Sequence, residues 1–203
     1  MSVQRVVLAS NNAGKLKEFN AILSAAGIQM VPQAELGIEE TDEPFHTFVE
    51  NALKKARHAS LESGLPALAD DSGLCVDALD GAPGVYSARY AQMQEGGDKS
   101  DAANNRLLVQ RLQGQAKRDA SYIAVLVYVR SATDPRPIVI EGNWRGQIVD
   151  QPVGEHGFGY DPHFYLPEQQ QTAAQMSPAL KNSISHRGLA LQALLARLQA
   201  EQS

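Results

Sequence analysis

The pattern of apolar and polar positions in the first third of the chain predicts strands that alternate with helices. Residues 6–8 form a short apolar run, which is typical of a buried strand. Apolar residues then recur at helical spacing and a glycine closes the pattern, at Leu16, Phe19, Ile22, Leu23 and Gly27. Residues 30–32 predict a second strand. Thr47 with Glu50 three positions later is a capping box, which predicts a helix that runs to Gly64.

The middle of the chain continues this alternation. Residues 67–79 alternate apolar and small side chains around an acidic pair, which predicts a strand or a hairpin, whereas residues 80–91 are rich in turn formers. Residues 101–114 have the periodicity of a helix with Leu108 and Leu112 inward. Two apolar runs on either side of a Pro-containing turn predict a hairpin over residues 121–131 and 136–149.

The C-terminal segment has the pattern of an amphipathic helix. Ser177 and Pro178 are a typical helix start, and an apolar stripe follows at Leu191, Leu194, Leu195 and Leu198. Because helices and strands interleave along the whole chain, the predicted fold class is α/β with a mixed sheet that contains an antiparallel hairpin.

Composition narrows the class of protein. The chain has 203 residues, 43% hydrophobic and 20% charged, enough for one large domain or two small lobes. A net charge of -5 disfavours a nucleic-acid-binding surface. Cys75 is the only cysteine, the N-terminus lacks the pattern of a signal peptide, and the longest apolar run, residues 123–129, is far too short to span a membrane. We therefore expect a soluble cytoplasmic protein.

The polar turn after the first strand is a candidate anion site. Residues 10–15, Ser-Asn-Asn-Ala-Gly-Lys, lie between a predicted strand and a predicted helix, where backbone N–H groups, the helix dipole and Lys15 favour an anion. The turn is not a P-loop, because Ala9 replaces the first glycine and Leu16 follows the lysine. The alternative is an ordinary strand-to-helix loop, with Asn and Gly chosen for their turn conformations.

Two acidic pairs are candidates for metal binding. Asp70 and Asp71 follow an apolar segment, and adjacent carboxylates repel each other unless a cation or a proton lies between them. Mg²⁺ takes oxygen ligands and shares them with substrate phosphates. The acidic loop at Asp42 and Glu43 is a further source of ligands. The alternative in both places is a solvated turn.

Two further motifs combine aromatic, glycine and basic residues. In residues 158–161, Phe-Gly-Tyr-Asp, an aromatic face is able to stack on a base and glycine lets the backbone approach a ligand. Lys181, His186 and Arg187 place three donors near a helix start. The alternatives are an edge strand and a solvated helix end. Together, the four motifs supply the parts that a nucleoside triphosphate site needs.

The combination resembles the inosine/xanthosine triphosphate pyrophosphatase family, whose members remove non-standard purine nucleotides from the nucleotide pool. The resemblance runs in order from Val6 to about Leu195. It is carried by "SNNAGKLKEF", "TFVENALKKARHA", "PALADDSGLCVDALDGAPGVYSARYA", "GFGYDP" and "KNSISHRGLAL". It implies that the chain hydrolyses the bond between the α and β phosphates of its substrate. It also implies one elongated domain with two lobes. A long central mixed sheet flanked by helices and an active site in the cleft between the lobes are also implied.

The resemblance also implies roles for individual residues. Asp71 would be the general base and a magnesium ligand, supported by Asp70, and Asp42 or Glu43 would supply a second ligand. Family members usually have Glu-Glu-Thr-Gly at the position of residues 42–45, so the choice between these two acids stays open. The substrate would contact Ser10, Asn11, Asn12, Ala13, Gly14, Lys15, Ser72, Phe158, Gly159, Tyr160, Asp161, Lys181, His186 and Arg187.

The resemblance further implies Mg²⁺ as the cofactor and a homodimer as the assembly, with no nucleic-acid or membrane partner. Two alternatives remain. One is a related pyrophosphatase that acts on modified pyrimidine triphosphates, against which the donors His186 and Arg187 favour a 6-oxopurine. The other is a nucleotide-sensing module without catalysis, which Asp70 and Asp71 disfavour because carboxylates beside a triphosphate are costly without a metal.

Overall fold

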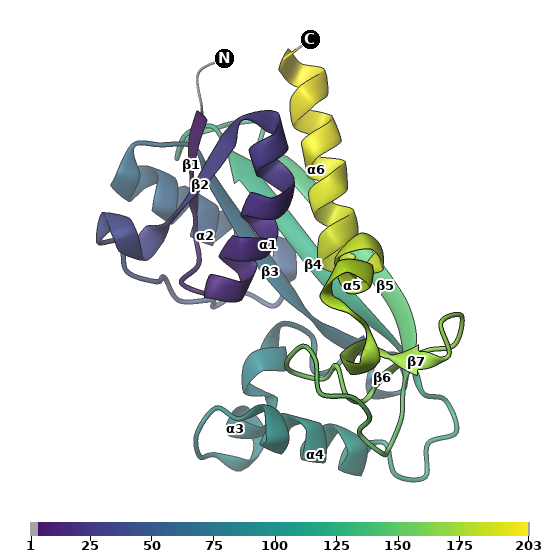
Figure 1. Ribbon diagram of the computed structural model, residues 1–203. Helices are drawn as coiled ribbons and strands as arrows, with labels where there is room; N and C mark the ends of the chain where they lie inside the picture. The colour runs from purple at the N-terminus through teal and green to yellow at the C-terminus, as the bar shows by residue number, and fades with distance from the viewer. Residues whose placement is uncertain (1–3, 203) are drawn as a thin grey trace. The chain divides into compact units, whose positions relative to one another are not determined.

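The computed structural model describes residues 4–202 as an alternation of strands and helices (Figure 1). The strands form a seven-stranded sheet in the order β2-β1-β3-β4-β5-β6-β7. Strand β1 pairs in parallel with β2 and β3, and β6 pairs antiparallel with β5 and β7, so the sheet is mixed as predicted. The strands are β1 (Gln4–Leu8), β2 (Ile28–Pro32), β3 (Ala67–Val76), β4 (Asp119–Val129), β5 (Ile138–Ile148), β6 (Phe164–Leu166) and β7 (Gln171–Thr172).

Two helices, α2 and α5, begin where the sequence predicted a helix start. The side chain of Thr47 accepts a hydrogen bond from the backbone N–H of Glu50 at the start of α2, and Ser177 does the same for Leu180 at the start of α5. The helices are α1 (Ala13–Leu23), α2 (Phe48–Ser63), α3 (Tyr90–Glu95), α4 (Asp101–Arg111), α5 (Pro178–Ile184) and α6 (His186–Gln202).

Three details of the secondary structure differ from the predicted elements or decide between them. Residues 67–79 form a single strand, β3, and then a short 3-10 turn, which excludes the hairpin alternative. The turn-rich segment ends in a short helix, α3, that the pattern did not predict. The C-terminal pattern belongs to two helices, because the backbone is extended at Ser185 between α5 and α6.

The described chain divides into two compact units. Strand β3 contributes to both, because the division falls between Asp71 and Ser72, and a second division falls between His186 and Arg187. The first unit comprises the described parts of Met1–Asp71, Ala124–Gly142 and Arg187–Ser203. The second comprises Ser72–Ile123 and Asn143–His186.

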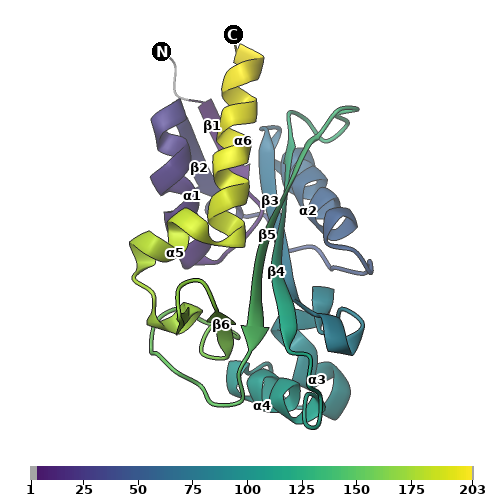
Figure 2. The same cartoon turned by 90° about the vertical axis from the view of Figure 1, so that its right-hand side faces the viewer.

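In the first unit, helices cover both faces of the sheet. Helices α1 and α6 lie on one side of the strands and α2 on the other, as Figure 2 shows. On the α1–α6 side, Phe19 and Leu191 are fully buried against strand residues such as Leu68. The α2 face is lined by small buried residues, Ala52, Ala56 and Ala59. The predicted leucine stripe of α6 is confirmed as a core face: Leu191, Leu194 and Leu198 are buried and Leu195 packs against them.

The second unit has its own core around the C-terminal ends of β3 and β5 and the N-terminal end of β4. Leu108 and Leu112 are fully buried there, which confirms the predicted inward face of α4. Aromatic residues fill the centre, where Tyr122 contacts the edge of Phe164 with ring centroids 4.7 Å apart. This core anchors the segment from β5 to α5 that carries the candidate base-binding residues.

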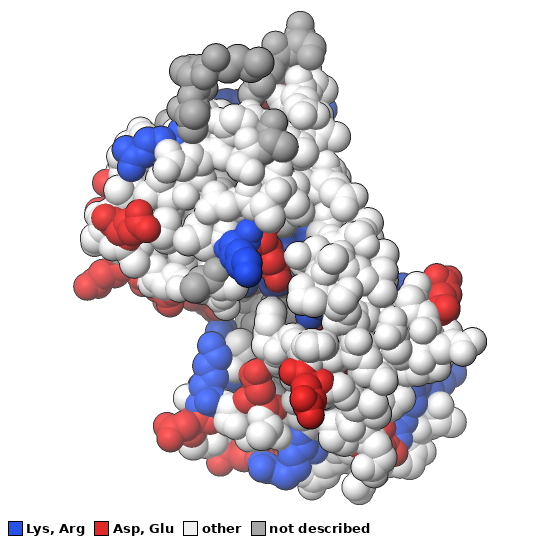
Figure 3. Space-filling view, in the orientation of Figure 1, with Lys and Arg blue, Asp and Glu red and all other residues white. Residues whose placement is uncertain are grey.

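The surface gives two further observations. Lys and Arg are interspersed with Asp and Glu on the face drawn in Figure 3, without one continuous basic area. Within residues 4–202, none of the helices is both long and apolar enough for a membrane span.

Candidate active site

The loop between β1 and α1 is organised by its own polar side chains. Ser10 Oγ accepts a hydrogen bond from the backbone N–H of Asn12 at 3.2 Å, and Asn12 Oδ1 accepts one from that of Lys15 at 3.1 Å. Asn12 is therefore the N-cap of α1, and Ala13 and Gly14 form its first turn. The helix dipole makes this end electropositive, so Ser10 to Lys15 form a turn that favours an anion.

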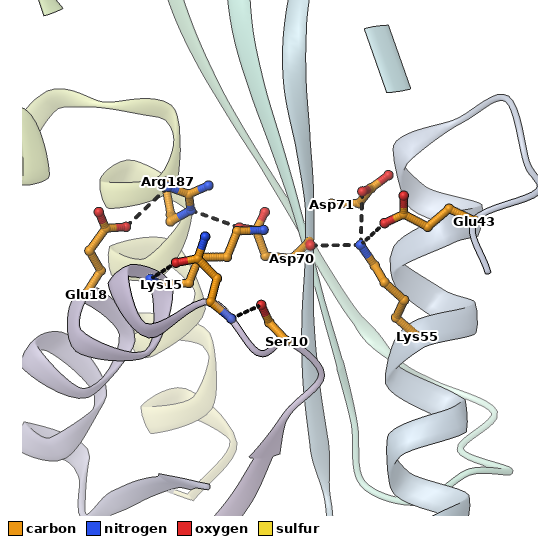
Figure 4. Close-up of polar contacts among 9 residues, drawn as sticks. Ser10, Lys15, Glu18, Glu43, Lys55, Asp70, Asp71 and Arg187 are labelled. Atoms are coloured by element: carbon orange, nitrogen blue, oxygen red, sulfur yellow. Dashed lines mark hydrogen bonds and ion pairs between the residues drawn. The ribbon is translucent and has the colours of Figure 1, made fainter. Parts of the chain in front are cut away.

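Asp70 and Asp71 lie on opposite faces of β3. Side chains alternate across a strand, so consecutive residues cannot point to the same side. Figure 4 shows Lys15, Glu18 and Arg187 on one side of the strand and Lys55 and Glu43 on the other. The expectation that the two carboxylates share one cation or proton is therefore wrong. Each has its own basic partners.

Asp70 is the centre of a buried ion-pair cluster. Its Oδ2 lies 3.1 Å from Lys15 Nζ and 2.9 Å from Arg187 Nε. Arg187 also contacts Glu18 at 3.3 Å. Burial favours the neutral acid, but Lys15 and Arg187 outweigh that effect and hold the pKa of Asp70 far below its ordinary value. Asp70 is thus held as an anion between two basic side chains.

The surroundings of Lys15 disfavour the charged form of its amine. Burial lowers the pKa of the Lys15 ammonium and the nearby Arg187 adds to this effect, against the attraction of Asp70. A further anion beside this amine would favour the charged form and raise the pKa of Lys15. The cluster therefore has the electrostatics of a phosphate-binding site.

Asp71 lies in a different environment on the α2 side. Lys55 Nζ donates to Asp71 Oδ1 at 3.0 Å, to Glu43 Oε1 at 2.8 Å and to the backbone oxygen of Asp70 at 3.0 Å. Burial raises the pKa of Asp71, and the carboxylates of Glu43 and Asp70 add to the rise against the opposing effect of Lys55. Burial lowers the pKa of Lys55, but the carboxylates of Asp71 and Glu43 outweigh it, so the pKa is raised. A carboxylate with a raised pKa is suited to accept a proton.

The two acids of the 42–45 segment bind different lysines and therefore lie in different surroundings. Lys55 binds Glu43 beside Asp71, whereas Lys54 binds Asp42, whose side chain is 74% exposed. The segment is held in place by Asn51, which exchanges two hydrogen bonds with the backbone of Phe45, at 3.0 and 3.1 Å. Glu43 is therefore the acid that faces Asp71.

The predicted metal ligands Glu43 and Asp71 are the two carboxylates bound to Lys55. Among residues 4–202, no group of three or more His, Cys, Asp or Glu side chains is close enough to hold a metal ion by itself. The carboxylates of Glu43 and Asp71 do converge on one amine, and Asp71 Oδ2 is buried without a hydrogen-bond partner. Two carboxylates fit Mg²⁺ that takes its other ligands from water and substrate phosphates.

In the second unit, Asp161 organises the Phe-Gly-Tyr-Asp segment. Its Oδ2 accepts the backbone N–H of Phe158 at 2.8 Å and pairs with Lys181. A side chain at position 157 would place a Cβ 2.0 Å from that oxygen, and Gly157 has φ +80°, so only glycine fits. The predicted residues Asp161 and Lys181 are thus brought together as an ion pair.

The remaining candidates of the second unit differ in exposure. The ring of Phe158 is 55% exposed, whereas Tyr160 is buried and donates its hydroxyl to the backbone oxygen of Ser87 at 2.8 Å. The buried His186 stacks on Tyr122 with ring centroids 4.8 Å apart. Ser72, half-buried, directly follows Asp71 on β3. Phe158 is therefore the exposed aromatic residue of this group, and Lys181 Nζ lies over its ring, 5.2 Å from the centroid.

The structure thus sorts the predicted residues into two groups, one in each unit. The first unit holds residues 10–15, Asp42, Glu43, Asp70, Asp71 and Arg187, and the second holds Ser72, residues 158–161, Lys181 and His186. The sequence interpretation missed Lys55 and Glu18. Lys55 lies in the segment "NALKKARHA" on the helix after the acidic loop, but nothing local distinguishes it from its neighbour Lys54.

Comparisons with known sequences agree over almost the whole chain. The model of the Ham1 family matches residues 6–197. A protein of Bordetella pertussis named dITP/XTP pyrophosphatase is 64% identical over 199 residues, which cover 98% of this chain and 93% of the relative. A protein of the same name from Ralstonia nicotianae is 62% identical over 197 residues, 97% of this chain and 98% of the relative.

Solved structures share the fold. A HAM1 protein from Coxiella burnetii aligns with a TM-score of 0.92 and 44% sequence identity, covering 97% of this chain and 99% of that one. The Ham1 protein of Staphylococcus aureus aligns with a TM-score of 0.88 and 39% identity, covering 98% of this chain and 100% of that one.

Proposed function

This chain belongs to the Ham1 family, and we infer that it hydrolyses non-standard purine nucleoside triphosphates. The substrates are inosine, deoxyinosine and xanthosine triphosphate, and the products are the nucleoside monophosphate and pyrophosphate. The names of relatives at 58–65% identity support this activity. Hydrolysis would remove these bases before they enter DNA or RNA.

The observation that carries the proposal is the contrast between two adjacent carboxylates. Asp70 neutralises Lys15 and Arg187 on one face of β3, and Asp71 has a raised pKa and a buried oxygen without a partner on the other. Oppositely tuned carboxylates are a signature of divided roles in catalysis. A fixed anion that holds basic residues and a carboxylate that accepts a proton are what triphosphate hydrolysis needs.

Asp71 is the general base in this proposal. In-line attack of water on the α phosphorus releases a proton, and the Asp71 carboxylate would accept it. Lys55 holds Asp71 through a hydrogen bond of 3.0 Å and so orients the carboxylate. Protonation of Asp71 removes a negative charge next to Glu43, which favours the transfer.

Lys15 and the turn of residues 10–15 would bind the triphosphate. The ammonium, the N–H groups of the first turn of α1 and the side chains of Ser10 and Asn11 supply donors for phosphate oxygens. Asp70 fixes Lys15 at 3.1 Å, so the charge is in place before the ligand arrives. This arrangement favours ligands with several phosphates.

Mg²⁺ is the proposed cofactor, with Glu43 and Asp71 as its protein ligands. When bound, the ion would neutralise charge on the phosphates and on the pyrophosphate that leaves. We assign no role to Asp42, because its carboxylate is bound to Lys54 at the surface.

The second unit would recognise the base and ribose through Ser72, Phe158, Gly159, Tyr160, Asp161, Lys181 and His186. Phe158 is placed to stack on any base, so it adds affinity without selectivity. His186 and Arg187 would donate to the 6-oxo group that distinguishes hypoxanthine and xanthine from adenine. Arg187 is bound by Asp70 and Glu18, so this second role of Arg187 stays a prediction.

The decisive experiment is pyrophosphate release from a panel of nucleoside triphosphates, with and without Mg²⁺. We expect fast, magnesium-dependent release from inosine and xanthosine triphosphates and slow release from adenosine triphosphate. Preferred release from modified pyrimidine triphosphates would instead identify the related pyrophosphatase. Nucleotide binding without release would identify a sensor module and would contradict the proposal.

The resemblance also supports a homodimer in the cytoplasm as the form in which the protein acts. Obligate dimers bury large apolar interfaces, and light scattering at micromolar concentration is expected to give twice the mass of the chain. A monomeric mass would contradict the dimer, and recovery of the protein outside the cytosolic fraction would contradict the location.

A further inference from the structure

The backbone of Gly159 is bound on both sides by side chains of α4. Its N–H donates to Asp101 Oδ2 at 2.8 Å, and its carbonyl accepts from Asn105 Nδ2, also at 2.8 Å. Residues four apart on a helix share one face, so Asp101 and Asn105 present an acceptor and a donor side by side. One helix face thus satisfies both polar groups of a single residue in the Phe-Gly-Tyr-Asp segment.

The segment needs such an anchor because its backbone is unusual. Gly157 and Gly159 have φ +80° and +63°, in the left-handed region. Between them, the ring of Phe158 is 55% exposed, with Lys181 Nζ 5.2 Å from its centroid. The hydrogen bond from the N–H of Phe158 to Asp161 fixes one side of that residue, and the Gly159 contacts fix the other.

Neither side chain caps α4. The N-cap of this helix is Ser100, whose hydroxyl accepts the N–H of Ala103 at 3.3 Å, so Asp101 is not the cap. Asn105 Oδ1 is buried without a hydrogen-bond partner, which costs stability. An apolar residue would avoid that cost, so the bond from Asn105 Nδ2 to Gly159 is what the amide provides.

We propose that Asp101 and Asn105 are positioning residues that hold the Phe158 ring ready to stack on the substrate base. The inference rests on the proposed function, which assigns Phe158 to the base. Loss of the two hydrogen bonds to Gly159 would weaken binding of the nucleoside part of the substrate and leave binding of the phosphates unchanged. Catalysis at Asp71 would continue once the substrate is bound.

The donors and acceptors predict which substitutions are tolerated. Gly159 N–H needs an acceptor, which both Asp and Asn supply, so Asp101→Asn keeps the contact. Gly159 carbonyl needs a donor, which Asn supplies and an ionised Asp does not, so Asn105→Asp loses the contact. These reciprocal changes of nearly equal size are matched controls for each other, and Asp101→Ala removes the acceptor outright.

The test compares a ligand that has a base with one that has none. In wild type and each variant, one measures KM and kcat for inosine triphosphate, and the inhibition constant of inorganic tripolyphosphate. For Asn105→Asp and Asp101→Ala, we expect KM to rise roughly 5-fold to 150-fold, the range of one lost base stack. The kcat and the inhibition constant of tripolyphosphate should stay within about twofold of wild type, and Asp101→Asn should resemble wild type throughout.

Either of two kinetic results would overturn the inference. One is an unchanged KM in Asn105→Asp and Asp101→Ala. The other is an equal loss for inosine triphosphate and tripolyphosphate, which would mean general damage to the fold. Hydrogen exchange of the peptide that contains Gly159 gives a readout without activity: it should quicken in Asp101→Ala and not in Asp101→Asn. If wild type fails to hydrolyse any nucleotide, the proposed function is wrong. Unchanged hydrogen exchange of the Gly159 peptide in Asp101→Ala would contradict only the positioning role.

Discussion

Asp70 and Asp71 are consecutive residues, yet their side chains lie on opposite faces of β3, against Lys15 and Lys55 respectively. Because successive side chains of a strand point to opposite faces, the two carboxylates lie on opposite sides of the sheet. Their pKa values are consequently shifted in opposite directions, down for Asp70 and up for Asp71. One dipeptide thus supplies both a fixed counter-ion and a proton acceptor.

Replacing the proton acceptor should abolish turnover without unfolding the protein. Asp71→Asn keeps the size of the side chain but removes the base, and loss of a general base costs about 10²–10⁴-fold in rate. Pyrophosphate release from inosine triphosphate measures the effect, and thermal unfolding checks the fold. Asp150→Asn is the matched control, since Asp150 pairs with Arg118 at the surface. A variant that keeps more than a tenth of wild-type turnover would exclude Asp71 as the base.

Replacing the fixed counter-ion should instead destabilise the protein. Asp70→Asn leaves Lys15 and Arg187 buried without their shared carboxylate, and breaking a buried ion pair in this way costs about 3–5 kcal/mol. Urea unfolding of the variant measures the loss. Asp77→Asn is the control, because Asp77 forms an exposed pair with Arg145 and such pairs contribute about 0–1 kcal/mol. Equal stabilities for the two variants would contradict the buried cluster.

Lys15 should discriminate by the number of phosphates on the ligand. Lys15→Ala removes the ammonium, so we expect weaker binding of inosine triphosphate and a much smaller change for inosine monophosphate, which lacks the distal phosphates. Calorimetric titration of both ligands measures the two affinities. Lys17→Ala is the control, because Lys17 lies exposed on the same helix. Equal losses for both nucleotides would show that Lys15 does not contact the distal phosphates.

Acid stability should depend in part on Asp134, in the connection between β4 and β5. Burial opposes its charge, but hydrogen bonds from the backbone N–H groups of Arg130 and Arg136 and from the Arg130 guanidinium lower its pKa below 3.8. Because the folded-state pKa is the lower one, the stabilisation is present above pH 3.8 and disappears as the pH falls through the folded-state value.

Asp134→Asn should therefore lose about 1.5–3 kcal/mol at neutral pH, the range for hydrogen bonds to a charged group. Its free energy of unfolding should also fall less steeply than that of wild type between about pH 5 and pH 2. Urea unfolding across this range measures both effects, with Asp98→Asn as an exposed control. Parallel pH profiles for wild type and Asp134→Asn would contradict the assignment.

Much of the local structure follows from the sequence, because it depends on neighbours a few residues apart. Thr47 and Ser177 cap their helices, and the leucine stripe of α6 is buried, as capping preferences and helical periodicity predict. The separation of α5 from α6 was not predicted, because the helix start at Ser177 and the leucine stripe were interpreted as parts of one helix, although the residues between them are mostly weak helix formers. The extended backbone at Ser185 breaks the helix.

The family resemblance identified most candidate residues from the sequence, but only the tertiary structure decided which charges meet. Nothing local assigns Arg187 to Asp70, 117 positions away, or Lys55 to Asp71, 16 positions away. Likewise, sequence alone left Asp42 and Glu43 as equal candidates. Short-range rules fix where an element begins and which face is apolar, whereas the partner of a buried charge depends on the order of strands and on the helix that covers each face. The burial and distances that tune a carboxylate therefore exist only after the elements have packed.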